Sequence, residues 1–88
     1  MTEKPHERAV GRITHYFGKI SVGIVELTDS LKVGDTIHIR GATADFTQTV
    51  GSMQVEHEQV QQAAAGQVIG TKVDERVHEG DQVFVLEA

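Results

Sequence analysis

The stretch "LKVGDTIHI" (Leu31–Ile39) recurs later in the chain as "VHEGDQVFV" (Val77–Val85). Both copies read apolar-x-x-Gly-Asp-x-apolar-x-apolar, so each places a Gly-Asp pair directly before an alternating strand. Glycine adopts positive φ at a turn without steric cost, and an aspartate accepts hydrogen bonds from nearby backbone N–H groups. A phosphate-binding loop needs G-x-x-x-x-G-K-[ST] before a helix, and neither copy has that pattern. We therefore interpret four residues as structural turns: Gly34, Asp35, Gly80 and Asp81.

Outward from this repeat, short alternating segments separated by turn residues predict an all-β domain, a barrel or a sandwich. The six predicted strands span residues 10–17, 19–27, 36–40, 45–55, 67–73 and 82–86. In the second strand, Val22 and Ile24 alternate onto one face, whereas Val25 and Leu27 lie on the other. A strand with apolar residues on both faces is expected to be covered on both sides.

One segment, "EHEQVQQAAAG" (Glu56–Gly66), is ambiguous because it is rich in helix formers and ends on a glycine suited to a helix C-cap. Its apolar stripe is thin, which favours a loop over a short helix, and both alternatives stay open. Gly51, inside the fourth predicted strand, marks a bulge or a bend.

Length and composition predict one domain. We expect a flexible lead-in at residues 1–8 and a single domain at residues 9–88. Hydrophobic residues make up 39% and charged residues 24% of the 88 residues, as in globular proteins. No apolar run approaches the roughly 20 residues of a membrane helix, and the N-terminus lacks the apolar stretch of a signal peptide. With no cysteine, the sequence offers no disulfide or thiolate metal site. These features favour a cytoplasmic protein that binds no membrane.

The charge is distributed unevenly. Residues 1–44 carry six Lys/Arg against five Asp/Glu, a net charge of +1, whereas residues 45–88 carry two against eight, a net charge of −6. Proteins that bind nucleic acid on their own present a basic face to the phosphates. The small basic patch available here, which includes Arg12, Lys19 and Arg40, argues against strong autonomous binding of RNA or DNA.

No catalytic constellation is visible. The five histidines have no metal-binding spacing, and the densest group, "EHE" (Glu56–Glu58), lies in the ambiguous segment. No serine has a nucleophile-elbow motif around it. The four aromatic residues are too few for a stacking platform and are expected mostly in the core: Tyr16, Phe17, Phe46 and Phe84. The residues alone thus indicate a non-enzymatic binding module with no catalytic residue, metal or cofactor.

The segments "LKVGDTIHIRG", "TVGSMQV", "AAAGQVIGTKV" and "VHEGDQVFVL" resemble domain 2 of translational GTPases such as elongation factor Tu. This resemblance implies a six-stranded closed β-barrel of the Greek-key type, here as a stand-alone module. The chain looks still closer to the barrel-like C-terminal domain of bacterial collagenase-like peptidases. In those domains, "THYFGKISVGIVELTDSLKVGDTI" and "DFTQTVGSMQVEH" have near-verbatim counterparts.

The first resemblance also implies a binding surface. In elongation factor Tu a Glu and an Arg around the fourth strand receive the aminoacyl end of tRNA, and these positions fall on Gln54 and His57. Alternation should make Gln54 project from the barrel wall. If this surface is not the site, the basic residues Arg12, Lys19 and Arg40 are the next candidates. The guanine-nucleotide motifs and the peptidase catalytic domain are absent from the sequence, so neither GTP binding nor proteolysis is expected.

Two functions stay open. The main hypothesis is an elongation factor-like module that contacts RNA or a protein of the translation machinery, such as a ribosome-associated component. The alternative is a protein-interaction accessory domain that works with a separate peptidase catalytic chain. The acidic second half of the chain weakens the first hypothesis, because it repels a polyanion. The oligomeric state is not predicted.

Overall fold

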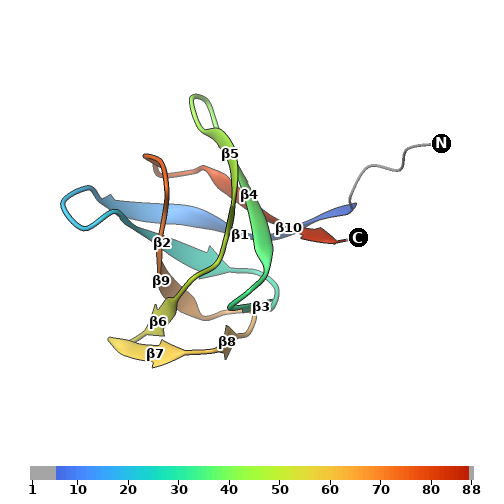
Figure 1. Cartoon of the computed structure of the whole chain (residues 1–88), viewed down its shortest axis with the longest axis vertical. Coiled ribbons are helices and arrows are strands. Elements are labelled where there is room, and N and C mark those ends of the chain that lie inside the picture. The colour runs from blue at the N-terminus through green and yellow to red at the C-terminus, as the bar shows by residue number, and fades with distance from the viewer. Residues whose placement is uncertain (1–5, 88) are drawn as a thin grey trace.

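The computed structural model describes residues 6–87, which form strands, turns and loops without any helix (Figure 1). The all-β prediction is therefore confirmed. The ten strands are β1 (His6–Phe17), β2 (Val22–Leu27), β3 (Leu31–Lys32), β4 (Thr36–Arg40), β5 (Asp45–Thr49), β6 (Met53–Val55), β7 (Glu58–Val60), β8 (Gln62–Ala63), β9 (Val68–Lys72) and β10 (Gln82–Glu87).

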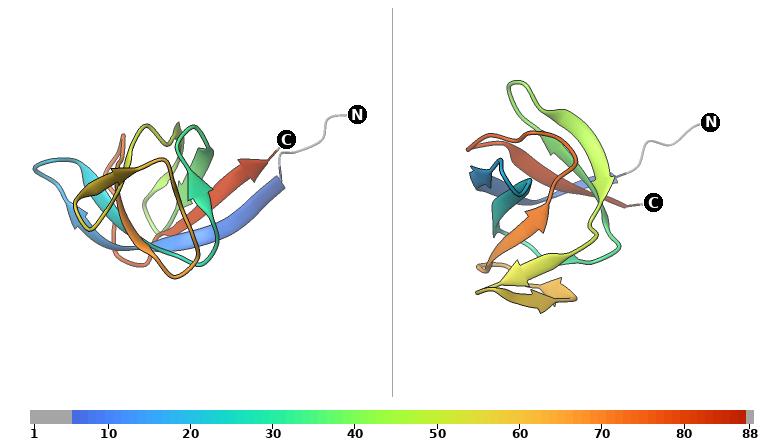
Figure 2. Two further views of the ribbon diagram at one scale, coloured as in Figure 1. Left: turned by 90° about the horizontal axis from the view of Figure 1, so that it is seen from below. Right: turned by 60° about the vertical axis from the view of Figure 1, so that its left-hand side comes forward.

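Eight of these strands form one antiparallel sheet in the order β5-β4-β10-β1-β2-β9-β6-β7, and β3 pairs with β8 in a separate two-stranded ribbon. The large sheet curls strongly around the core, as the two views of Figure 2 show. The predicted closed six-stranded Greek-key barrel is not confirmed, because in residues 6–87 no strand ladder joins the edge strands β5 and β7.

The predicted strand at residues 45–55 explains this difference. It is split at Val50–Ser52 into β5, which is one edge of the sheet, and β6, which lies next to the other edge strand β7. Gly51, at the break, is exposed, in agreement with the predicted bend. The chain thus passes from one edge strand of the curled sheet to the strand beside the other edge within three residues, and these residues do not continue the ladder.

A buried side chain links the edge strand β5 to the end of β9. The Gln48 amide Nε2 donates to the Lys72 carbonyl at 2.8 Å, and its Oε1 accepts from the Asp74 N–H at 2.7 Å. Gln48 is only 8% exposed, so both bonds are shielded from water. An amide side chain here joins two parts of the sheet that the backbone leaves unpaired.

The core lies inside the curl and follows the strand alternation. In β4, Ile37 and Ile39 are fully buried, and in β10 the same is true of Val83. Burying one such side chain contributes about 1.5–3 kcal/mol relative to leaving it exposed. The remaining core consists mainly of Val10, Ile13, Val25, Leu27, Leu31, Val50, Met53, Ile69, Val77 and Val85.

The two Gly-Asp turns have the same local geometry. Gly34 has φ 97° and Gly80 has φ 91°, the left-handed region that favours glycine. In the first turn the Asp35 carboxylate accepts the Lys32 N–H at 3.0 Å, and in the second the Asp81 carboxylate accepts the His78 N–H at 2.8 Å. Each aspartate therefore stabilises the turn that precedes its own strand.

Each turn also holds the backbone of one buried residue on another part of the chain. Val50 exchanges two hydrogen bonds with the first turn, accepting from the Gly34 N–H and donating to the Asp35 carbonyl. Ile13 makes the equivalent two bonds with Gly80 and Asp81. Because these glycine N–H groups donate to carbonyl oxygens inside the fold, the turns serve the structure and do not form a phosphate loop.

The segment Glu56–Gly66 contains no helix. Two short strands, β7 and β8, interrupt the predicted loop, and Val60 and Ala63 are the residues that face the core. Gly66 has φ 89° in a tight turn rather than at a helix C-cap. The helix-forming composition of this segment was overridden by strand pairing with β6 and β3.

The predicted lead-in at residues 1–8 falls partly outside the described residues, which begin at His6. Residues 6–8 belong to β1, which pairs with β10 from His6 opposite Glu87 onward. Arg8 forms ion pairs with Asp29 at 2.5 Å and with Glu87 at 2.7 Å. The pKa of Arg8 is raised, mainly by its hydrogen bond to Asp29 and next by its hydrogen bond to Glu87. The pKa of Asp29 is lowered, mainly by the same bond from Arg8 and next by the hydrogen bond that the Ser30 N–H donates.

Candidate functional site

The outer face of the sheet carries a groove where β2, β9 and β6 lie side by side. Its floor comes from outward-facing positions of β2 and β9, where Ile24 lies opposite Gly70. On the other side of Gly70, Gln54 of β6 borders this floor. A side chain at Gly70 would contact Val22 and Ile24 at about 3.4–3.5 Å, so the glycine keeps the floor open. The groove encloses about 300 Å³. We call it the apolar groove; it is lined by Phe17, Ile20, Val22, Ile24, Gln54, Glu56, His57, Val68, Ile69 and Gly70.

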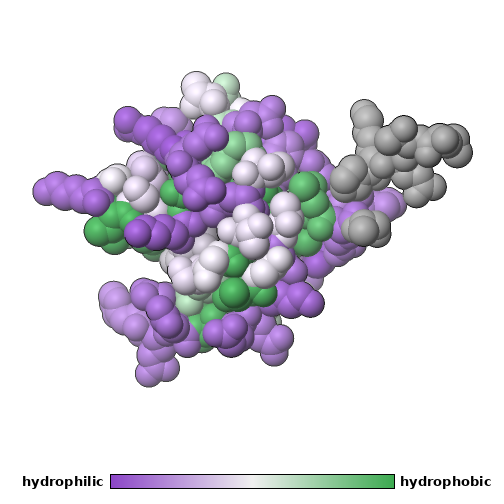
Figure 3. Space-filling view, in the orientation of Figure 1, coloured by the Kyte–Doolittle hydropathy of each residue, from purple (hydrophilic) through white to green (hydrophobic). Residues whose placement is uncertain are grey.

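Three large hydrophobic side chains are exposed in residues 6–87, and all three line the apolar groove. Phe17 is 45% exposed, Ile20 is 58% exposed and Val68 is 48% exposed. Hydrophobic surface is visible at the tip of the β1–β2 hairpin in Figure 3. Single exposed hydrophobic residues are common on proteins, but a grouped set beside a hollow is typical of a binding surface.

Phe17 corrects one sequence-based expectation, that the aromatic residues lie mostly in the core. Phe46 is buried and Tyr16 packs against the core, but Phe17 projects outward. Its ring lies 4.9 Å from that of His15, two residues earlier on the same face of β1. Phe17 is the last residue of β1, and its exposure depends on how the hairpin lies against β9 and β6, which the sequence does not show.

Strand β2 explains why the groove is apolar. Val25 and Leu27 point inward and are 1% and 2% exposed, whereas Val22 and Ile24 point outward and are half-buried. The sequence predicts cover on both sides of this strand. In the described residues the core covers the inner side, and the outer side forms the floor of the apolar groove. The two-sided apolar pattern was therefore the sequence signal for this surface.

The rim of the groove contains both residues of the predicted binding pair. Gln54 projects outward from β6, as predicted, while its neighbour Met53 is buried. Glu56 and His57 form the two-residue turn between β6 and β7, in which Val55 pairs with Glu58. The structure thus brings Gln54 and His57 to one groove, although their role in binding stays a prediction.

The turn itself is unusual. Glu56 has φ 50° and His57 has φ 68°, so both central residues of this hairpin adopt positive φ. Two-residue hairpins with this backbone strongly favour Asn-Gly, which tolerates the left-handed region. Strain of this kind costs on the order of 1–3 kcal/mol per residue and tends to occur at functional sites. Here it occurs at the rim of the apolar groove.

The three predicted basic residues do not form one cluster around the groove. Arg12 and Arg40 lie in one row across the sheet, each opposite Gln82 of β10. Arg12 is 3.7 Å from Glu26, and the Arg40 guanidinium lies over the Phe84 ring at 4.9 Å. Lys19 is placed elsewhere, in the β1–β2 turn next to Ile20. Of the three, Lys19 is the one that flanks a residue of the apolar groove.

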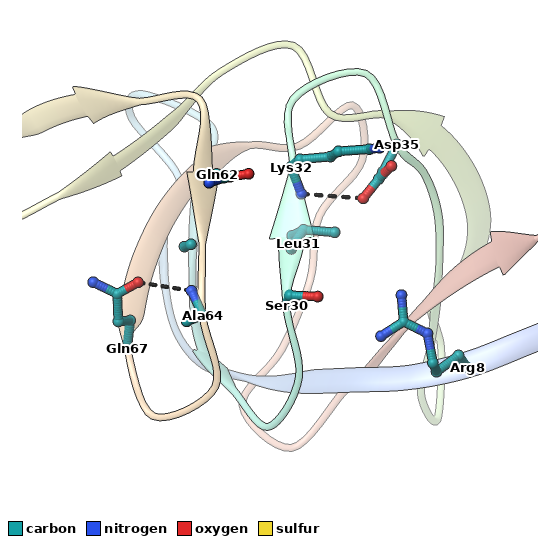
Figure 4. Close-up of a pocket in the computed structure, with 9 residues that line it drawn as sticks. Arg8, Ser30, Leu31, Lys32, Asp35, Gln62, Ala64 and Gln67 are labelled. Atoms are coloured by element: carbon teal, nitrogen blue, oxygen red, sulfur yellow. Dashed lines mark hydrogen bonds between the residues drawn. The ribbon is translucent and has the colours of Figure 1, made fainter.

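A second, larger groove of about 530 Å³ runs beside the β3–β8 ribbon, and we call it the polar groove. Figure 4 shows Arg8 on one side of β3 and Gln62, Ala64 and Gln67 on the other. Its hydrogen-bonding groups are largely engaged within the fold. The Gln67 side chain accepts the Ala64 N–H at 2.7 Å, Asp35 accepts the Lys32 N–H, and Arg8 pairs with two carboxylates. These internal contacts make it the weaker candidate for a binding site.

His38, in β4, lies between two carboxylates of other strands. Its Nδ1 is 2.5 Å from Glu7 and its Nε2 is 2.5 Å from Asp45. Hydrogen bonding to Asp45, and then to Glu7, raises the pKa of His38. The contacts tie β1 and β5 to β4, which is a structural role. Residues 6–87 contain no group of three or more His, Asp or Glu side chains placed to hold a metal ion.

In the part of the chain that the structure describes, there is no helix long and apolar enough to cross a bilayer.

The fold described above matches that of one C-terminal domain of known structure. Two crystal structures of the C-terminal domain of a Geobacillus thermoleovorans protein, described as a U32 peptidase, superpose on the chain with a TM-score of 0.83 each. The first, a selenomethionine variant, is 18% identical and covers 86% of this chain and 96% of its own. The second is 17% identical and covers 97% and 98%. At these identities the likeness establishes the fold.

A sequence relative agrees with this result. An uncharacterized protease of Methanocaldococcus jannaschii is 41% identical over 78 residues, which make up 88% of this chain and 19% of the protease. The chain thus spans about a fifth of the length of this relative. No protein-family model matches the sequence.

These comparisons correct the translation-factor interpretation. The similar proteins are a protease and the C-terminal domain of a peptidase, not elongation factors. Of the two resemblances in the sequence, that to the peptidase domain is the one supported. The Gly-Asp turns on which that interpretation partly rested are a way of entering a strand and imply no particular activity.

Proposed function

We propose that the chain is a non-catalytic accessory domain of the peptidase type, which acts by binding a catalytic part supplied by another chain. One observation carries the proposal: 41% identity to a segment that is only a fifth of a protease. The rest of that protease lies outside the segment. The part of such a protease outside the matched segment is therefore the partner that we propose for this chain.

The surface of the chain supports an interaction role. The apolar groove presents three exposed hydrophobic side chains beside a polar rim, which is the composition of a protein-binding surface. Both ring nitrogens of His38 bind carboxylates of other strands, which is typical of a structural residue. Both features favour binding over catalysis.

The test uses the M. jannaschii protease with its 78 matched residues deleted, which we call the truncated protease. Isothermal titration of the truncated protease with the 88-residue chain should give saturable 1:1 binding. The full-length protease is the control and should bind more weakly, because its own segment competes for the same surface. The chain alone should not hydrolyse an unfolded protein substrate. Absence of binding, or hydrolysis by the chain alone, would contradict the proposal.

A further inference from the structure

We propose that the apolar groove is the surface through which the chain docks onto the peptidase catalytic part. Its occupant is an apolar segment of that part which offers one hydrogen-bonding group to Gln54 and His57. This inference rests on the function proposed above and adds the location and chemistry of the contact.

The first step is the two-sided character of β2. Apolar residues on both faces are typical of strands that are covered on both sides. The inner side chains Val25 and Leu27 are buried, but the outer ones, Val22 and Ile24, lie at the floor of an open groove. The outer face therefore has the composition of a buried surface without its cover.

The second step identifies the cover. The chain matches about a fifth of its protease relative, so most of that protein is available to pack against this segment. Phe17, Ile20 and Val68 supply a cluster of exposed hydrophobic groups, and burying such clusters drives association. The exposed Gln54 and His57 at the rim provide hydrogen-bonding capacity that an apolar segment with one polar group would satisfy.

The third step is the position of the groove relative to the described chain ends. His6 pairs with Glu87 at one end of β1, whereas Phe17 lies at the other end of the same twelve-residue strand. Figure 1 shows the start of β1 and the end of β10 on the right, and the β1–β2 hairpin on the left. A partner on the apolar groove therefore approaches the end of β1 that lies away from the His6–Glu87 pair.

The fourth step is the strained turn. Glu56 and His57 both adopt positive φ, where Asn-Gly would be more stable. A backbone conformation that disfavours these side chains is consistent with a role for the side chains themselves, since binding surfaces often sacrifice stability. Both residues line the groove, so their side chains are placed to contact its occupant.

The first experiment removes the hydrophobic cluster. In the variant Phe17→Ser/Ile20→Ser both side chains are already exposed, so the melting temperature should change little. Its affinity for the truncated protease should fall at least about tenfold, as expected for central hydrophobic contacts. The matched control is Lys32→Ser/Gln62→Ser, which alters two exposed residues of the polar groove and should leave the affinity unchanged.

The second experiment separates contact from strain. The variant Glu56→Asn/His57→Gly should raise the melting temperature, because the new residues suit positive φ, and should lower the affinity for the truncated protease. Loss of affinity together with gain of stability supports the contact. A more stable variant with unchanged affinity would overturn the role of the rim.

A hybrid protease keeps the inference testable if the truncated protease does not fold. In the hybrid, this chain replaces the 78 matched residues of the full-length M. jannaschii protease. Docking should couple the two parts into one thermal transition, and Phe17→Ser/Ile20→Ser should split it into two. One unsplit transition in the variant would overturn the proposed surface.

The outcomes distinguish the two proposals. If the parent chain does not bind the truncated protease, the proposed function fails. If the parent chain binds and the Phe17→Ser/Ile20→Ser variant binds equally well, only the groove assignment fails. Sedimentation of the isolated chain tests whether a second copy of the chain occupies the groove instead. If the parent chain is a dimer and the Phe17→Ser/Ile20→Ser variant is a monomer, a second copy fills the groove and the inference is overturned.

Discussion

The two Gly-Asp copies, Leu31–Ile39 and Val77–Val85, have the same hydrogen bonds but different surroundings. Their strands β4 and β10 pair antiparallel, with His38 opposite Phe84 at equivalent positions of the two copies. The copies therefore face each other around an approximate local twofold axis. The difference is burial: Asp81 is 4% exposed, whereas Asp35 is partly exposed and lines the polar groove.

Asp81 is also enclosed by its neighbours. A side chain placed on Gly41 would overlap the Asp81 carboxylate, so the glycine makes room for it. The comparison shows that a short motif determines the geometry of a turn, whereas the tertiary position determines how much that turn contributes to stability. Four predictions test this separation of geometry and energy.

The largest effect is expected for Asp81→Ala. The change removes the acceptor of the partly buried His78 N–H and empties the enclosed position of the Asp81 carboxylate, and leaving a shielded polar group unsatisfied costs about 1–3 kcal/mol. Urea unfolding should show a correspondingly lower free energy of unfolding. Asp81→Asn retains an acceptor oxygen and should lose less. An Asp81→Ala variant as stable as the parent would show that burial does not strengthen this turn.

Asp35→Ala should have the smaller effect of the two aspartate variants. The Lys32 N–H that it releases is exposed and can bond to water, so we expect a loss of about 0.5–1.5 kcal/mol. The double variant with Asp81→Ala should show additive losses, because the two carboxylates share no hydrogen-bond partner. Equal losses in the two single variants would contradict the comparison.

Gly34→Ala and Gly80→Ala should have nearly equal effects. A Cβ at either position would meet no atom within 4 Å, so the loss arises from the backbone conformation alone. Both glycines have φ above 90°, and we expect about 1 kcal/mol for each substitution. Urea midpoints measured side by side provide the check. A large difference between the two variants would mean that the turns differ in geometry and not only in burial.

The sequence predicted much of this fold because its signals were local. Alternation located the main strands, and the Gly-Asp pairs located two turns. The open sheet was not predictable in the same way. It arises at the break at Val50–Ser52, and the long-range bonds of the Gln48 side chain to Lys72 and Asp74 replace the missing ladder, which no local pattern encodes. The strands β7 and β8 were missed because their pairing outweighs a helix-forming composition.

The candidate site was partly visible in the sequence. Gln54 and His57 were predicted as neighbours, and the structure places both on the apolar groove. The hydrophobic part of the groove was missed, although the two-sided pattern of β2 indicated it. Phe17 and Val68 lie on different strands and line the same groove only in the folded, curled sheet. Tertiary proximity of this kind is not contained in the spacing of either segment.

The smallest expected effect concerns the central pair of the two copies, His38 and Phe84. Because Asp45 and Glu7 raise the pKa of His38, its contribution to stability is complete below the unfolded value of about 6.5. It is lost as the pH rises through the higher folded value, where the imidazole becomes neutral beside two carboxylates.

Arg40, whose guanidinium lies over the Phe84 ring, is a further charged group beside this pair. Replacing His38 with Phe, the residue of the second copy, should remove the downward slope of stability above about pH 6.5. Urea midpoints of parent and variant between about pH 6 and pH 9 measure this slope. If the two proteins keep the same slope, His38 is not the titrating group, and the two copies do not differ in their response to pH at this position.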